Sequence, residues 1–141
     1  MAQQATYEDV NLILRLYEMR REEKMRAARG WFLGNFKPKS LAEMQQLCPP
    51  GSDANAFMRQ TVSYWDMVAS FVTSGVLNQE LFFQSGAELL NVWVRIEPIL
   101  PEVRAAFKNP GTWANLEKVG KAFADHLGPD VYAGFVARVR G

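Results

Sequence analysis

The chain has 141 residues, the size of one ordinary domain, of which 48% are hydrophobic and 22% are charged. This composition excludes a disordered chain, and we expect a single all-helical domain over residues 1–141. A net charge of only +1 excludes a strong overall field toward nucleic acid, and a single cysteine excludes an intramolecular disulfide.

Apolar residues recur at intervals of three and four along the whole chain, which predicts a bundle of about six helices. The first helix is expected to begin after Thr6, in a capping-box start, and to run at least to Ala28. Its middle is charged almost all round, so we expect that part to face water. Its apolar stripe consists of Val10, Leu14, Tyr17, Met25, Ala28 and Phe32.

The next two helices have clear start and stop signals. Ser40 is expected to cap a short helix that ends at Cys48. Ser52 is expected to cap a third helix that ends at Ser74 and Gly75. One face of this third helix is apolar and predicted to be buried: Phe57, Thr61, Tyr64, Trp65, Val68 and Val72.

The second half of the chain continues the pattern. Asn78 is expected to cap a fourth helix, in which Trp93 faces inward. Prolines at 98 and 101 kink or restart it, Thr112 is expected to cap the following helix, and Gly128 precedes a last helix over 131–140. The polar residues of the fourth helix are predicted to lie outside: Gln84, Glu88, Asn91 and Arg95.

A polar groove is one candidate site. If the third and fourth helices pack antiparallel, Asp66 lies level with Glu88, and Arg59 lies level with Arg95. Two carboxylates close together would raise the pKa of one of them and suit acid–base chemistry. The alternative is that these residues simply line solvated faces that point in different directions.

An aromatic segment after the first helix is a candidate interface. Trp31, Phe32 and Phe36 lie among glycines, and a first helix reaching Phe32 would overhang a compact bundle. We therefore expect the chain to form a homodimer through this segment and the first helix. The alternative is that the glycines bend the chain and the rings fold back onto the core of the same subunit.

Other functional groups give weaker signals. His126 is interpreted as a residue at a helix C-terminus and Cys48 as a structural thiol, and no metal or cofactor is expected. The basic residues between 20 and 26 alternate with glutamates, so nucleic-acid binding is not expected. No apolar run approaches the length of a membrane span and no signal peptide is evident, so we expect a soluble, cytoplasmic protein.

The middle of the chain resembles a known family. The residues that carry the resemblance are Tyr64 to Ala69, Gly75 to Leu81, Trp93, Glu97-Pro98, Arg104, and Trp113 to Phe123. Over about residues 55–125 they resemble DUF4760, an uncharacterised bacterial domain of unknown function. The resemblance implies an all-helical fold and brings no catalytic residue. Many relatives carry a membrane-spanning helix ahead of the domain, whereas this chain starts directly with a charged helix.

Together these observations favour a non-enzymatic helical module for interaction or regulation, whose protein partner the sequence does not identify. The alternative is a small ligand-binding or hydrolase-like domain that uses the polar groove of Arg59, Asp66, Glu88 and Arg95.

Overall fold

The computed structural model describes residues 4–141, and this part of the chain contains helices and no strand. The all-helical prediction is therefore confirmed, but there are more helices than the six or so that we expected. They are α1 (Tyr7–Arg20), α2 (Glu23–Asn35), α3 (Leu41–Leu47), α4 (Asp53–Thr73), α5 (Gln79–Phe83), α6 (Ala87–Ile96), the 3-10 turn η1 (Glu97–Ile99), α7 (Leu100–Phe107), α8 (Ala114–Leu127) and α9 (Pro129–Arg140).

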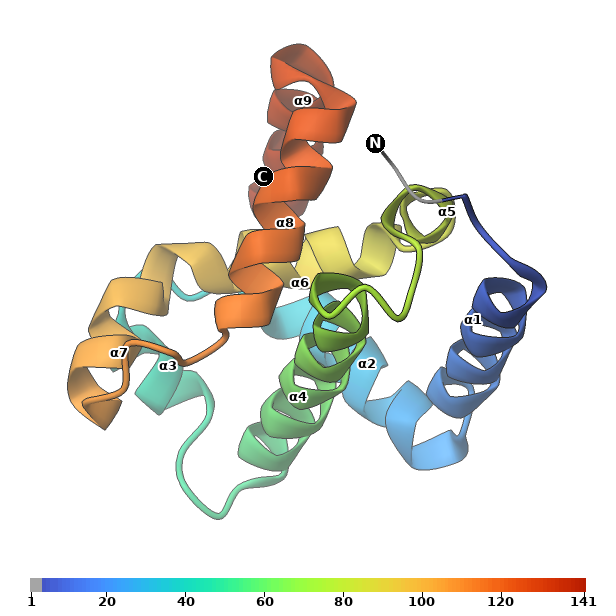
Figure 1. Ribbon diagram of the computed structural model, residues 1–141. Helices are drawn as coiled ribbons and strands as arrows, with labels where there is room; N and C mark the ends of the chain where they lie inside the picture. The colour runs from blue at the N-terminus through green and yellow to red at the C-terminus, as the bar shows by residue number, and fades with distance from the viewer. Residues whose placement is uncertain (1–3) are drawn as a thin grey trace.

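Helix α4 is the centre of the fold, with α2 and α8 packed against it (Figure 1). Helix α6 crosses behind α4 and α8 and also contacts α9. Every one of these helices gives at least one residue to the same buried cluster. Trp65 and Trp93 both lie in it, 3% and 1% exposed, as their helical faces predicted. Helix α1 lies at the edge of the molecule and gives it only Leu16.

The prediction of one long first helix is wrong. The chain turns at Arg21 and Glu22, and α2 runs back toward the core. The Glu22 side chain accepts hydrogen bonds of 3.1 Å from the backbone amides of Lys24 and Met25, and so caps α2. A carboxylate at this position also interacts favourably with the positive end of the helix dipole. The charged run that we interpreted as a wet helix middle therefore contains a helix boundary.

The fourth predicted helix is also divided, into α5 and α6, at residues 84–86. A Cβ atom at Gly86 would lie 2.5 Å from the ring of Phe82, so only glycine lets the turn close against this ring. Because of this turn, α6 crosses α4 steeply and does not return alongside it (Figure 1). The antiparallel pairing that we assumed for the polar groove is therefore wrong.

Most predicted helix starts are confirmed, with one exception. Side chains of Thr6, Ser40, Ser52 and Asn78 each accept a backbone amide in the first turn of α1, α3, α4 and α5. Thr112, in contrast, does not cap α8. That helix begins after Trp113, which has a φ of 57° and makes no side-chain cap, and the amide of Leu116 donates instead to Asp66 on α4.

Candidate functional site

Helix α1 presents an apolar stripe to solvent. The exposed fractions along the stripe are 77% for Tyr7, 41% for Val10, 55% for Leu14 and 45% for Tyr17. Their spacing of three, four and three residues places them on one face of the helix, in the pattern of a coiled-coil seam. We call these four residues the α1 stripe. Within the described part of the chain, Arg20 and Arg21 lie over the Tyr17 ring, and the exposed area of the stripe faces solvent.

The opposite face of α1 is held to the core by hydrogen bonds to its carbonyl groups. The hydroxyl of Tyr64 donates to the carbonyl of Leu16, and Nη1 of Arg29 donates to the carbonyl of Arg20 at 2.8 Å. Burial raises the pKa of Tyr64 to about 12, so this hydroxyl stays a neutral donor at physiological pH. These two hydrogen bonds attach the C-terminal half of α1 to α2 and α4.

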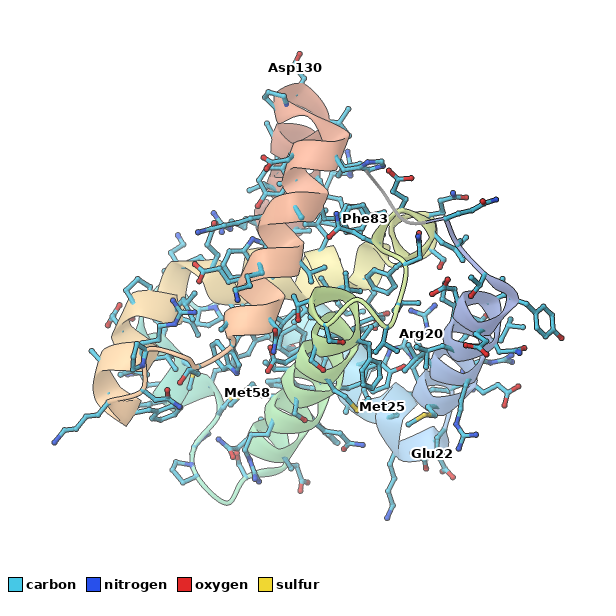
Figure 2. All side chains as sticks on the ribbon, in the orientation of Figure 1. Arg20, Glu22, Met25, Met58, Phe83 and Asp130 are labelled. Atoms are coloured by element: carbon cyan, nitrogen blue, oxygen red, sulfur yellow. The ribbon has the colours of Figure 1, made fainter. Side chains whose placement is uncertain are left out.

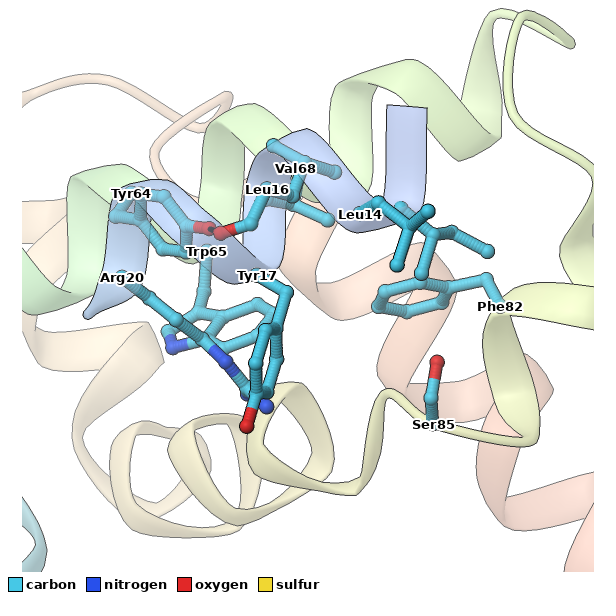
Figure 3. A pocket seen from close by; sticks show the side chains of 10 residues that line it. Leu14, Leu16, Tyr17, Arg20, Tyr64, Trp65, Val68, Phe82 and Ser85 are labelled. Carbon is cyan, nitrogen blue, oxygen red and sulfur yellow. Dashed lines mark hydrogen bonds between the residues drawn. The ribbon is translucent and has the colours of Figure 1, made fainter. Parts of the chain in front are cut away.

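A cavity of about 280 Å³ opens between α1, α4 and α5, beside the α1 stripe, and two residues of the stripe, Leu14 and Tyr17, form part of its wall. Its walls are mostly apolar and aromatic, and its lining contains no carboxylate. Figure 3 shows Arg20 and Tyr17 together over Trp65 at one end, and Leu14 with Phe82 at the other. The lining residues are Ile13, Leu14, Leu16, Tyr17, Arg20, Tyr64, Trp65, Val68, Phe82 and Ser85. The volume lies just below the usual range for small-molecule pockets.

Arg20 is the one charged residue of this lining, and its side chain lies between α1 and α4 (Figure 2). Its guanidinium carbon lies 4.9 Å from the ring centre of Tyr17 and 5.7 Å from that of Trp65. These are cation–π distances. Among the described residues no carboxylate pairs with this guanidinium.

A charged cluster lies behind the cavity wall. Glu88 accepts two hydrogen bonds of 2.7 Å from Arg29, and its Oε2 also accepts the indole N–H of Trp65 at 3.0 Å. The pairing with Glu88 raises the pKa of Arg29. Because Glu88 neutralises Arg29, the end of the cavity near Trp65 keeps one unbalanced positive charge, that of Arg20.

The structure gives the four residues of the predicted groove separate partners. Asp66 accepts the Leu116 amide of α8, Glu88 pairs with Arg29, and Arg59 donates to Asn55 within α4. Arg95 donates to the Phe36 carbonyl and to Asn91. None of these hydrogen bonds joins two of the four. The exposed position that we predicted for Arg95 is wrong, because α6 lies inside the fold and leaves this residue 7% exposed.

The predicted aromatic interface folds onto the core of its own subunit. Phe32 and Phe36 are completely buried, with stacked rings whose centres lie 4.6 Å apart. Trp31 is half-buried, 6.2 Å from the ring of Phe57. A second subunit cannot reach Phe32 or Phe36 in this fold. The turn at Arg21 and Glu22 is the reason, since it directs α2 inward.

The histidine and the cysteine of the chain are both packed against the core. The imidazole of His126 packs 5.1 Å from the ring of Phe83, and Cys48 is a buried thiol whose pKa is raised by burial. Within residues 4–141, no three metal-ligating side chains come together. In the same range, every helix is too short or too polar to cross a membrane.

Sequence reasoning missed Arg20 and the separate exposure of the α1 stripe. The spacing of Tyr7, Val10, Leu14 and Tyr17 was visible in the sequence, but we extended the same apolar stripe into α2. The seam ends at Arg21, where a charged residue takes the next apolar position, and the helix boundary itself is formed by the Glu22 cap of α2.

A family model described as a domain of unknown function (DUF4760) matches residues 5–123. No curated protein and no solved structure matches the chain. The matched range is longer than the resemblance over about residues 55–125 and includes α1, the residues that line the cavity and most of α8.

Proposed function

We propose that this chain, which belongs to the DUF4760 family of unknown function, is a non-enzymatic interaction module that pairs with a second copy of itself through α1. The observation that carries this proposal is the exposed α1 stripe. A regulatory role would follow from the control of this pairing.

The spacing of the stripe supports a helix as the occupant. Apolar residues at alternating intervals of three and four form a narrow seam, which is the pattern of helices that pair side by side. An antiparallel pair related by a twofold axis sets Tyr7 of one copy beside Tyr17 of the other, and Val10 beside Leu14. Each side chain would then lose contact with water without any change in the core.

The charges of α1 support a second copy as the partner. The first turn carries Glu8, the helix ends at Arg20, and Arg21 follows directly as its C-cap. An antiparallel pair brings the acidic end of each helix toward the basic end of the other, and a parallel pair would bring like charges together. Because α1 is only about 21 Å long, the interface is small, and we expect a dissociation constant of about 10 to 100 µM.

Sedimentation or light scattering between about 5 and 500 µM tests the proposal. The wild-type mass should rise from 16.0 kDa toward twice that value with concentration. Leu14→Glu should keep the mass at that of a monomer, while Val131→Glu, an equally exposed apolar position on α9, should leave the association unchanged. A wild-type mass that stays at 16.0 kDa, with circular dichroism showing folded protein, would reject the pairing.

A second candidate function rests on the cavity beside the stripe. Its apolar walls and the unpaired Arg20 suit a small aromatic or aliphatic carboxylate, with the apolar part inside and the carboxylate at the guanidinium. Calorimetric titration with 2-naphthoate tests this function. Binding that is lost in Arg20→Gln and kept in Arg15→Gln, an exposed arginine of the same helix, would support it. If the wild type does not bind 2-naphthoate, this second function is rejected.

We also propose that the chain forms a single domain and that it works in the cytoplasm. The single buried cluster shared by the described helices supports one domain, and the free Cys48 suits a reducing, cytoplasmic environment.

A further inference from the structure

A smaller cavity is formed by the loop after α2, the end of α6, the 3-10 turn η1 and the end of α9. Its volume is about 60 Å³. Four of the residues that line it are basic, and none is acidic. The lining consists of Lys37, Pro38, Lys39, Val94, Arg95, Pro98 and Arg140.

Arg95 is the unusual member of this group, because it is a buried charge without a counter-charge. Its Nε donates to Asn91 at 2.6 Å and its Nη1 donates to the carbonyl of Phe36 at 3.0 Å. Both acceptors are neutral, and no carboxylate pairs with Arg95 among residues 4–141. Burial accordingly lowers its pKa, with no acid to oppose the effect. Burying an ion without a partner of opposite charge is costly.

The neighbouring charges do not cancel this excess. Arg140 pairs with Glu97 at 3.0 Å, and its Nη2 and Nε also donate to the Val94 carbonyl. Among residues 4–141, one other carboxylate is hydrogen-bonded to a residue of the cavity lining: Glu43 accepts the backbone amide of Lys39. Against the four cations, these two acids leave an excess of about two positive charges, close to the charge of a phosphate group at neutral pH.

We propose that this cavity binds a phosphate group, either as the free ion or as the end of a small phosphate ester. The cavity has room for about one tetrahedral oxyanion. Arginine guanidinium groups are well suited to phosphate oxygens, and the two lysines, which are exposed, add charge at the entrance. A bound phosphate would supply the counter-charge that Arg95 lacks. The site shares no residue with the α1 stripe or the cavity beside it.

The structural roles of the two arginines must be separated from anion binding. Arg95 ties α6 to the end of α2, and Arg140 ties α9 to α6, so removing either side chain can destabilise the fold. The test therefore uses Lys37→Ala/Lys39→Ala, because both lysines are exposed. The matched control is Lys24→Ala/Lys118→Ala, which removes two exposed lysines from α2 and α8 and causes the same change in net charge.

The experiment is a titration with inorganic phosphate, and separately with phenyl phosphate, at constant ionic strength set by chloride. Binding is followed by the NMR signals of the arginine Nε–H groups and by the melting temperature. We expect the signals of Arg95 and Arg140 to shift with one saturation curve, and the melting temperature to rise. The affinity should increase severalfold from pH 5.5 to 7.5 as the dianion forms. Sulfate, a dianion throughout, should show no such increase.

The variant Lys37→Ala/Lys39→Ala should bind phosphate about fivefold or more weakly than the wild type does. The control variant Lys24→Ala/Lys118→Ala should bind it less than about twofold more weakly. Saturation by phenyl phosphate alone would assign the site to phosphate esters, and saturation by inorganic phosphate alone would assign it to the free ion. The proposal is overturned if neither compound shifts the Arg95 signal more than chloride does, or if both variant pairs bind like the wild type.

Discussion

Asp9 on α1 binds the backbone amide of Asn78, 69 residues farther along the chain. Its Oδ1 accepts this amide at 2.8 Å, while its Oδ2 accepts the amide of Thr6 at 2.7 Å. One carboxylate thus completes the capping box of α1 and fastens the helix to the start of α5. The helix that carries the proposed dimer interface is anchored through this residue.

This contact predicts an acid-sensitive attachment of α1. The amides of Thr6 and Asn78 lower the pKa of Asp9 from its ordinary value of 3.8. Since the folded-state pKa is the lower one, the stabilisation is complete above about pH 4 and is lost as the pH falls through the folded-state value. Urea unfolding from pH 2 to 7 should show Asp9→Asn less stable than wild type at neutral pH, with the difference shrinking in acid. A difference independent of pH would contradict this account.

Asp66 supplies the control, because its shift has the opposite sign. Burial raises the pKa of Asp66, although the Leu116 amide acts in the other direction. Its neutral form is therefore favoured in the folded state, and that contribution is present below pH 3.8 and lost as the pH rises through the folded-state pKa. Relative to wild type, Asp66→Asn should gain stability as the pH rises, the reverse of the trend for Asp9→Asn.

The Arg29–Glu88 pair should contribute more to stability than an exposed ion pair. The two side chains are 19% and 13% exposed, and the carboxylate also holds the indole of Trp65. We expect Arg29→Leu to lower the free energy of unfolding by about 2 kcal/mol, because Glu88 loses its counter-charge while staying largely buried. The matched change Lys121→Leu, which breaks the more exposed pair with Glu117, should cost less than about 0.5 kcal/mol. Equal costs in urea unfolding would contradict the prediction.

The contact between α6 and α8 should tolerate no side chain at Gly120. A Cβ atom there would lie 2.4 Å from the indole of Trp93, which is fully buried and cannot move away easily. We expect Gly120→Ala to destabilise the protein by about 2 kcal/mol or more. Gly134→Ala on α9, where the nearest atom lies 3.6 Å away, should instead stabilise it by about 0.5 kcal/mol. Thermal unfolding of the two variants measures the contrast, and a neutral Gly120→Ala would show that the helices can separate cheaply.

The end of α4 requires glycine for a different reason. Gly75 has a φ of +83° and no atom near its missing Cβ, so a side chain there meets backbone strain and no clash. Gly75→Ala should cost about 1 to 2 kcal/mol, and Gly75→Val should cost more. Gly30→Ala, in the helical and exposed part of α2, should stabilise the protein by up to about 1 kcal/mol. A melting temperature unchanged by Gly75→Ala would contradict this role.

Local patterns in the sequence predict the helical class, the capped starts of α1, α3, α4 and α5, and the burial of the tryptophans of α4 and α6. These features are local: a side chain such as Ser52 caps amides a few residues away, and the faces that hold Trp65 and Trp93 follow from the helical repeat.

Contacts between helices, which local patterns do not predict, determine which polar residues pair and which apolar residues stay exposed. Arg29 and Glu88 are separated by 59 residues, and their pairing depends on the turn at Arg21 and Glu22 and on the crossing of α6 behind α4. Helical periodicity gives the face of a residue on its own helix, but it does not give the angle between two helices. That angle buries Phe32 and Arg95 and leaves Leu14 and Tyr17 exposed on α1. It is set by side-chain packing at the crossings, such as that of Trp93 on Gly120, between residues far apart in the chain.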